Sequence, residues 1–446
     1  MNETPLEAVA QIGLLLAVIL VAAKLGGEVA VRWLKLPPVL GELSAGILVG
    51  PFALGGFTIG SFGPLFEVPK VTEVVDGVMR TVESSIPVEP ELFFLAQAAA
   101  VLLLFQAGLE TNRQRFFRYV RPAAAVALGG VLVPFAFGVV ATVVAGFASF
   151  ESTRELLPAL FIGAVLTATS VGITARVLAD VRRLDTPEGV TVMAAAVVDD
   201  VLGILILAVV IGVADEGGIS GMDIFVVAAK AIGFWLGLTL LGSLAAPYIS
   251  RGVLWFQNAG ADLAIALALA FFAAAVAEIF FGLAMIIGSY TIGLALSDTE
   301  LKRRIEEPML WVNHFVVPVF FVVIGMQVDP GGVVGGALGF GLVLAALAIL
   351  SKLIGAGLPA LLVGFNRRGS WRIACGMLPR GEVALTIAGI GLASGVIDRE
   401  LFGVAVLMVV ATLPVAPPLL MWAFTTGGSG LRRPEVGSAE AGEPTD

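Results

Sequence analysis

The sequence predicts an all-α protein that crosses a membrane many times. Of its 446 residues, 58% are hydrophobic and only 14% are charged, and the mean hydropathy is +0.99. Soluble domains carry roughly 25% charged residues, so this composition does not fit a protein that folds in water. The apolar residues also gather into runs of about 20, which is the length that one helix needs to cross the hydrocarbon core.

Such runs give about thirteen predicted spans. Their approximate bounds are 7–25, 37–55, 92–111, 122–147, 156–178, 189–213, 223–250, 260–281, 283–297, 307–326, 333–361, 371–393 and 399–425. The first run reaches spanning length after an acidic start, so we expect no cleavable signal peptide. The segment 427–446 is rich in Gly, Pro, Ser and Glu, which predicts a short disordered cytoplasmic tail.

The basic residues predict the orientation of these spans. An odd number of spans places the two termini on opposite sides of the membrane. With the N-terminus outside, 19 Lys and Arg residues fall near inner loops and 4 fall in outer loops, as the positive-inside rule requires. The sequence therefore predicts a multi-pass protein of a prokaryotic-type cell (inner) membrane, with its N-terminus outside and its C-terminus in the cytoplasm.

One long outer segment, 57–91, interrupts the series of short loops. Within it, apolar residues recur at helical spacing, which predicts an amphipathic helix along the outer surface. These residues are Val71, Val74, Val75, Val78, Met79 and Val82.

Thirteen spans divide into six, one connector and six, so that the two groups of six enter the membrane from opposite sides. This arrangement predicts an inverted repeat with interrupted helices at matching positions, the fifth and twelfth spans. The fifth contains Thr167, Thr169, Ser170, Gly172 and Thr174, and the twelfth contains Gly376, Pro379, Arg380, Gly381 and Glu382. Proline removes a helix hydrogen bond and glycine adds backbone freedom. The alternative is that these small residues only allow close helix packing.

The adjacent acids Asp199 and Asp200 lie about ten residues into the sixth span, near the membrane midplane. An ionisable residue at that depth costs at least about 2.5–3.5 kcal/mol, so it needs a partner or a function. Neighbouring residues differ by about 100° around a helix, so the two carboxylates face different surroundings. Lys352 in the eleventh span is the expected counter-charge, and burial lets a lysine lose its proton. The alternative is that these three residues form an inert buried ion network. Two carboxylates and one lysine, however, leave one carboxylate without a counter-charge.

Other ionisable residues receive a structural interpretation. We expect Arg380 and Glu382 to clamp the interrupted twelfth span rather than to bind the transported species. Glu42, Lys230 and Glu278 lie where they could reach the membrane surface.

Single cysteine and histidine residues exclude several classes of site. Cys375 alone cannot form an intramolecular disulfide, and His314 alone cannot build a multi-histidine zinc or haem site. The basic residues are scattered over short loops, which is not the pattern of nucleic-acid binding. We therefore expect no metal-dependent catalysis and no cofactor.

Several stretches resemble the monovalent cation:proton antiporter-2 family, in particular the NapA-type sodium/proton antiporters with the NhaA-like fold. They are LPPVLGELSAGILVGP (Leu36–Pro51), TATSVGITARVL (Thr167–Leu178), AAVVDDVLG (Ala195–Gly203), the helix of Lys352, and LPRGEVAL (Leu378–Leu385). The paired aspartates and the upstream TSVGITAR are the most specific of these. Two features depart from the family: the outer segment 57–91 is longer, and the long nucleotide-binding tail of the Kef-type potassium efflux relatives is absent.

The resemblance implies a homodimer in which a core moves against a dimerising panel. Its parts would be panel helices 1–3 in 1–111, core helices 4–6 in 122–213, a linker helix in 223–250, panel helices 8–10 in 260–326, and core helices 11–13 in 333–425.

The resemblance also implies roles for individual residues. Asp200 would be the principal carboxylate for the cation and the proton, with Thr169 and Ser170 as oxygen ligands or supports. Asp199 would pair with Lys352. The interrupted helices would be supported by Gly172, Pro379, Arg380, Gly381 and Glu382.

The expected activity is sodium/proton antiport by alternating access, electrogenic, serving pH and sodium homeostasis. Within the class, the alternative is potassium/proton antiport, because oxygen ligands suit either ion. An intramembrane aspartyl protease is a remote alternative, since adjacent carboxylates diverging by about 100° cannot easily share a proton. A channel or a non-transporting sensor on the same scaffold is a further alternative.

Overall fold

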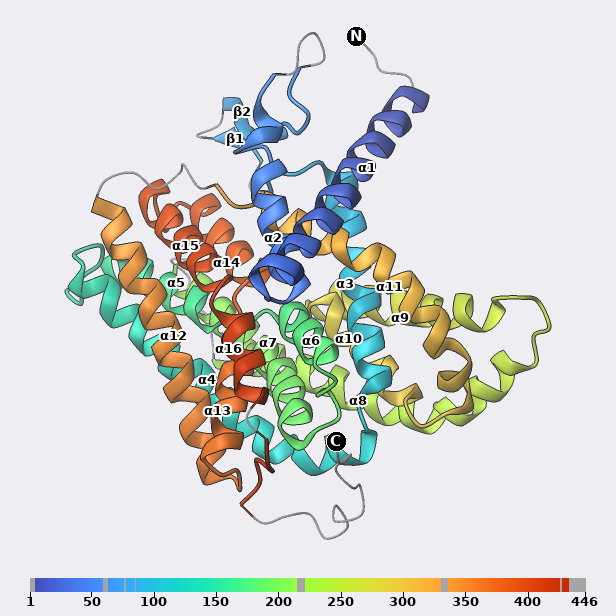
Figure 1. The fold of residues 1–446 in the computed structure, drawn as a ribbon. Helices are drawn as coiled ribbons and strands as arrows, with labels where there is room; N and C mark the ends of the chain where they lie inside the picture. The colour runs from blue at the N-terminus through green and yellow to red at the C-terminus, as the bar shows by residue number, and fades with distance from the viewer. Residues whose placement is uncertain are drawn as a thin grey trace.

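The fold comes from a computed structural model that describes residues 5–58, 63–75, 78–84, 86–214, 221–329, 336–425 and 427–432. Nearly all of the described chain is helical, apart from one small sheet (Figure 1). The α-helices are α1 (Pro5–Val29), α2 (Pro38–Val49), α3 (Pro90–Glu110), α4 (Arg113–Val144), α5 (Thr153–Thr167), α6 (Val171–Asp180), α7 (Pro187–Ala214), α8 (Gly221–Leu254), α9 (Ala261–Phe281), α10 (Met285–Leu296), α11 (Glu300–Met326), α12 (Gly336–Leu362), α13 (Arg367–Gly376), α14 (Glu382–Ala393), α15 (Arg399–Thr412) and α16 (Ala416–Thr425). A π-helical turn (Ala30–Leu34) extends α1, and a 3₁₀ turn (Leu54–Gly56) follows α2.

Eleven helices within the described residues are long and apolar enough to cross a membrane. Two of the thirteen predicted spans do not reach that length. The ninth corresponds to the short helix α10, and the twelfth is divided into α13 and α14. The structure therefore agrees with a multi-pass membrane protein. The number of spans reaches thirteen only if these two shorter helical segments are also counted.

The helices pack as two groups (Figure 1). In the first, α2 packs on α1 and α11, and α10 packs on α3, α8 and α9. In the second, α4 and α12 form the centre, with α5, α7, α13, α14, α15 and α16 around them. The groups meet mainly where α6 packs on α3 and where α7 packs on α8.

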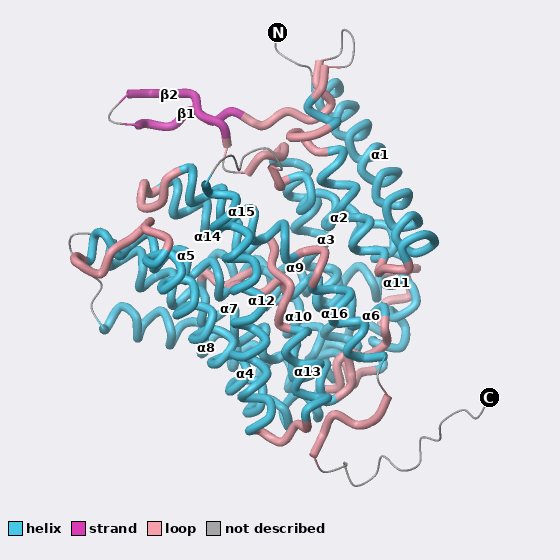
Figure 2. Tube along the Cα trace, turned by 60° about the vertical axis from the view of Figure 1, so that its left-hand side comes forward, coloured by secondary structure: helices cyan, strands magenta, loops and turns pink. Residues whose placement is uncertain are grey.

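The outer segment contains a β-hairpin, so the predicted amphipathic helix was wrong. β1 (Lys70–Val75) pairs antiparallel with β2 (Val78–Glu83), and Figure 2 shows the pair standing apart from the helices. The register joins Lys70 to Glu83 and Val75 to Val78. Valine and threonine favour strands because their branched side chains are stiff in a helix. The overlooked signal is the dipeptide Asp76–Gly77, typical of a two-residue hairpin turn, which lies outside the described residues.

The beginning of the expected disordered tail is instead attached to the helices. Asn366 donates from its backbone N–H to Gly430 O at 2.8 Å and from its side-chain amide to the carbonyls of Ser429 and Leu431. Arg432 N–H donates to Gly364 O at 3.0 Å. Residues 427–432 are thus bound across the turn between α12 and α13, and residues 433–446 lie outside the described residues.

Glycines let central helices touch backbone to backbone. A Cβ atom on Gly46 of α2 would meet the carbonyl of Val322 and the backbone of Gly325 in α11, and a Cβ atom on Gly129 of α4 would meet the carbonyl of Gly355 in α12. Such close approach increases van der Waals contact, which drives helix association in lipid.

The Gly46→Ala substitution is expected to lower the midpoint of thermal unfolding of the detergent-solubilised protein by several degrees, because the added methyl group forces α2 and α11 apart. Gly233→Ala in α8 is the matched control, since a Cβ atom there meets nothing within 4 Å. Alanine also favours the helix at that site. Equal midpoints for the two variants would contradict the packing described above.

Candidate functional site

The two interrupted helices meet at their interruptions. α5 ends at Thr167 and α6 begins at Val171, while α13 ends at Gly376 and α14 begins at Glu382. The backbone N–H of Ser170 donates to the carbonyl of Pro379 at 2.7 Å. This contact joins residues 209 positions apart in the chain. It brings together backbone groups of both interruptions that lie outside the regular helices.

Further contacts flank this crossing. Thr174 Oγ1 donates to the carbonyl of Gly376 at 2.8 Å. A Cβ atom on Gly381 would come within 2.9 Å of Ser170 Oγ, and one on Gly172 would come within 2.9 Å of the Phe320 ring in α11. The glycines are therefore needed because the neighbouring elements leave no space for a side chain.

Arg380 links the interruptions to a third helix. Its side chain is fully buried, and its guanidinium donates to the carbonyl of Ala168, in the first interruption, and to Ala348 O in α12 at 3.4 Å. It thereby binds the carbonyl of Ala168, which lies just past the end of α5, and joins this interruption to the middle of α12. The role of Arg380 as a clamp stays a prediction. Of Glu382, only the backbone position at the start of α14 is described.

The predicted charged residues lie beside this crossing. Lys352 Nζ of α12 donates to Asp199 Oδ1 of α7 at 2.9 Å, and the two side chains are 0% and 1% exposed. Asp200, the next residue of α7, is also buried and attracts Lys352 electrostatically, while Arg380 attracts Asp199. Two carboxylates and two cations thus share one site away from water.

Thr169 Oγ1, in the first interruption, and Asp199 Oδ2 are buried and have no hydrogen-bond partner among the described residues. A buried polar atom without a partner costs about 1–3 kcal/mol. Hydroxyl and carboxylate oxygens are ligands that hard cations prefer, so these atoms suit a desolvated cation.

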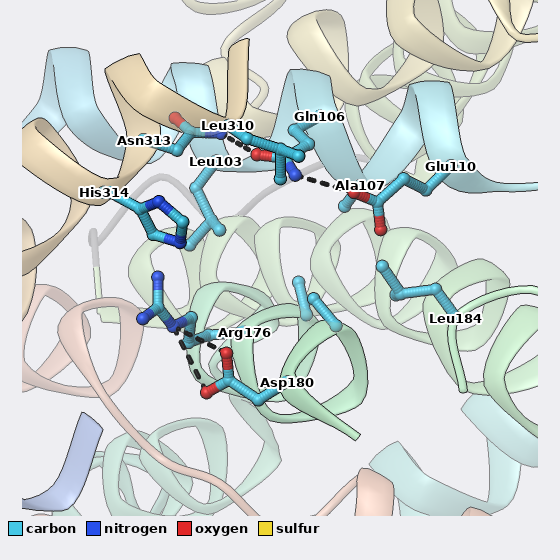
Figure 3. Close-up of a pocket in the computed structure, with 12 residues that line it drawn as sticks. Leu103, Gln106, Ala107, Glu110, Arg176, Asp180, Leu184, Leu310, Asn313 and His314 are labelled. Carbon is cyan, nitrogen blue, oxygen red and sulfur yellow. Dashed lines mark hydrogen bonds and ion pairs between the residues drawn. The ribbon is translucent and has the colours of Figure 1, made fainter. Parts of the chain in front are cut away.

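A polar cavity of about 170 Å³ lies where α6 meets α3 and α11 (Figure 3). Its polar lining residues are Gln106, Glu110, Arg176, Asp180, Asn313 and His314. The cavity is lined by the second half of α6, from Ala175 to Asp180, which lies about 8–15 Å along that helix from the interruption at Ser170. The cavity and the crossing are therefore at opposite ends of one short helix.

Hydrogen bonds order the cavity wall. Gln106 donates to Glu110 Oε1 at 2.6 Å and accepts from the Asn313 amide, so α3 and α11 are joined. On the opposite wall, Arg176 Nε pairs with Asp180 at 3.3 Å, and Figure 3 shows the Arg176 guanidinium extending toward His314. The sequence analysis did not identify this cluster, because its members come from three separate spans.

The sequence analysis interpreted Glu42 as a residue that could reach the membrane surface, and the structure differs. Its side chain in α2 is buried, and its Oε2 has no hydrogen-bond partner among the described residues. Arg176 and Lys24 attract it electrostatically. Lys230 and Glu278 are exposed, and their reach to the membrane surface stays a prediction.

A second buried ion pair escaped the sequence analysis altogether. Arg372 Nη1 of α13 donates to Glu188 Oε1, in the first turn of α7, at 2.6 Å, and the side chains are 7% and 4% exposed. Arg372 also donates to the carbonyls of Ala423 and Gly428. No sequence pattern joins residues 188 and 372, and Arg372 resembled an ordinary loop cation.

The Glu188→Gln substitution is expected to destabilise the protein by about 3–5 kcal/mol, because it leaves the buried Arg372 charge without its counter-charge. Chemical unfolding of the purified protein measures this loss. Glu300→Gln is the control, since its pair with Arg303 is exposed and is worth at most about 1 kcal/mol. Similar losses in the two variants would show that burial does not matter here.

Comparisons with known proteins identify a family and several relatives that match nearly the whole chain. The profile of the family described as "Sodium/hydrogen exchanger, transmembrane" matches residues 15–426. The high-affinity Na(+)/H(+) antiporter NhaS3 of Synechocystis is 37% identical over 95% of this chain and 92% of its own length. The Na(+)/H(+)-K(+) antiporter GerN of Bacillus cereus is 35% identical over 92% of this chain and 95% of its own length.

Solved structures share the fold. The sodium proton antiporter MjNhaP1 from Methanocaldococcus jannaschii superposes with a TM-score of 0.64 over 94% of this chain and 98% of its own, at 17% identity. At that identity the likeness concerns the arrangement of the helices.

Proposed function

The chain belongs to the sodium/hydrogen exchanger family, and on that premise we propose that it exchanges cytoplasmic Na⁺ or Li⁺ for external protons by alternating access. It is a transporter and not an enzyme. The observation that carries the proposal is the buried group of Asp199, Asp200, Lys352 and Arg380 beside the crossing of two interrupted helices.

Charge balance couples the two ions in this proposal. With both aspartates ionised and Lys352 and Arg380 charged, the site is neutral (−2 + 2 = 0). A sodium ion would leave it with an unbalanced positive charge in a low-dielectric interior, which is costly. Loss of a proton from Lys352 restores neutrality.

The cycle then follows. Facing the cytoplasm, Asp200 gives its proton to water and binds Na⁺ with help from the Thr169 hydroxyl. Asp199 is released from Lys352, which also gives a proton to water. After the core has moved, external protons return to Asp200 and Lys352, and the cation leaves. The sodium-loaded site is neutral and the proton-loaded site carries one positive charge. Each cycle therefore moves one net charge, and the exchange is electrogenic.

The helix packing supports a division into moving parts. In this proposal a core of residues 122–213 and 333–425 moves against a panel of 1–111 and 260–326, with 223–250 as the linker. The panel forms a homodimer in a prokaryotic-type inner membrane, with the N-terminus outside. The polar cavity between α3, α6 and α11 is the cytoplasmic approach to the site, and it lies where core and panel meet.

Potassium/proton exchange is the second candidate. The name of the Bacillus cereus relative includes both Na⁺ and K⁺, and oxygen ligands serve either ion. The protease alternative finds no support, because the hydrogen bond of Lys352 to Asp199 takes the place of a proton shared between two carboxylates.

The Asp200→Asn variant is expected to lose cation-driven proton movement, by at least about a hundredfold, while remaining folded, because it removes the carboxylate that both ions share. The measurement uses proteoliposomes with an internal pH dye, challenged in turn with sodium, lithium and potassium. Asp262→Asn, at the start of α9 and outside the site, is the matched control. Full activity of Asp200→Asn would refute the proposal, and the order of response to the three ions decides between sodium and potassium.

A further inference from the structure

One buried acid has no part in the exchange cycle described above. Glu42 of α2 is 2% exposed, and its Oε2 has no hydrogen-bond partner among the described residues. A buried polar atom without a partner costs about 1–3 kcal/mol. That cost would be recovered if a hydrogen-bond donor approached Glu42 in another conformation of the protein.

Three charged groups act on Glu42. Arg176 of α6 and Lys24 of α1 attract it, while Asp180 of α6 repels it. Lys24 Nζ donates to the carbonyl of His314 in α11 at 2.8 Å. α1, α2 and α11 pack on one another, so Lys24 keeps its place relative to Glu42 when the two helix groups move. Arg176 is the cation whose position relative to Glu42 changes, because α6 belongs to the proposed moving core.

Arg176 is only weakly held in this structure. Its Nε pairs with Asp180 on the same helix at 3.3 Å, and the two side chains are 13% and 29% exposed. Its two terminal nitrogens make no hydrogen bond among the described residues, and Figure 3 shows the guanidinium extending toward His314 at the wall of the polar cavity. An ion pair that water reaches contributes about 1 kcal/mol or less, so Asp180 can give up Arg176 at little cost.

Arg176 and Glu42 lie on two helices that pack directly across the boundary between core and panel. α2 belongs to the panel, α6 belongs to the core, and the two are in contact. The second half of α6, which carries Arg176, also lines the polar cavity. A movement of α6 toward α2 would therefore bring Arg176 to Glu42 and narrow the cavity at the same time.

We propose that Arg176 and Glu42 form a latch that closes the cytoplasmic approach to the ion site. This inference rests on the proposed function, because it uses the movement of the core against the panel. With the cavity present, as in this structure, Arg176 pairs with Asp180 and Glu42 Oε2 has no partner. When the ion site faces outward, the terminal nitrogens of Arg176 donate to the Glu42 carboxylate, and Asp180 stays in contact with water.

The chemistry of the two groups suits such an exchange of partners. The planar guanidinium presents two parallel N–H groups that fit the two oxygens of a carboxylate. The charge of Arg176 has a carboxylate partner in both states, so neither state contains an isolated arginine charge. Closing the inner approach while the outer one is open prevents a leak of ions through the site. The alternative is that Glu42 is an inert buried acid, whose removal would not affect the cavity.

The test measures how fast a small water-soluble methanethiosulfonate reagent labels a cysteine in the cavity of the purified full chain in detergent. The parent protein carries Ala107→Cys, on the α3 wall of the cavity, and Cys375→Ala, which removes the natural thiol. Glu42→Gln, Arg176→Gln and the two combined are made in this parent. Glu28→Gln and Arg303→Gln are the matched controls, since both residues are exposed and lie outside the cavity.

Each single variant is expected to label at least about threefold faster than the parent, because loss of the buried ion pair shifts the population toward the open cavity. The double variant should label no faster than the faster single variant, since both substitutions remove the same pair. Glu42 does not line the cavity, so its effect on labelling has to act through Arg176. A Glu42→Gln rate equal to that of the controls would overturn the proposal, and so would two effects that multiply in the double variant.

A further variant keeps the test decisive if Glu42→Gln does not fold. Asp180→Asn removes the competing partner of Arg176, so the latch should form more often and labelling should slow by at least about twofold. Opposite shifts in Asp180→Asn and Arg176→Gln support the latch, and shifts in the same direction overturn it. Labelling needs no transported ion, so its outcome is separate from that of the Asp200→Asn transport measurement.

Discussion

The structure depends on the need to balance charge inside a membrane. Asp199 and Lys352 form a hydrogen bond of 2.9 Å with almost no exposure to water, and neither could remain charged there alone. Asp200 and Arg380 extend this pair to a group of four whose charges cancel. In the proposed mechanism, a cation enters this group only if a positive charge leaves it. That balance gives exchange rather than uptake.

In the proposed function, the interrupted helices give a cation access to oxygen ligands beside the four buried charged residues. An intact helix keeps all its carbonyl groups in its own hydrogen bonds. The interruptions at Ala168–Ser170 and Met377–Gly381 release backbone groups, some of which bind each other and Arg380. Thr169, in the first interruption, has a buried hydroxyl oxygen with no hydrogen-bond partner among the described residues. In the proposed function, the break in the backbone supplies ligands at a depth where water cannot.

How far the sequence predicts this site depends on the kind of signal. Asp199, Asp200 and Lys352 stand out because ionisable residues in apolar runs are costly, and Pro379 and Gly381 indicate a break by their backbone chemistry. The hydrogen-bond partners of Arg380 and the pairing of Glu188 with Arg372 are set by tertiary contacts, which leave no local pattern in the sequence. The hairpin was mistaken for a helix because Val71, Val74 and Val75 recur at the helical spacing i, i+3, i+4, while the turn dipeptide Asp76–Gly77 was given no weight. The functional roles assigned to these residues remain predictions.

The most direct test counts the protons released when sodium binds to the purified protein in weakly buffered detergent solution, at a pH where Asp200 and Lys352 both carry protons. Binding and proton release are linked wherever one site holds either ion. Our account predicts about two protons per sodium ion in the wild type and about one in Lys352→Gln. Sodium binding without proton release, or the same number of protons in both proteins, would contradict it.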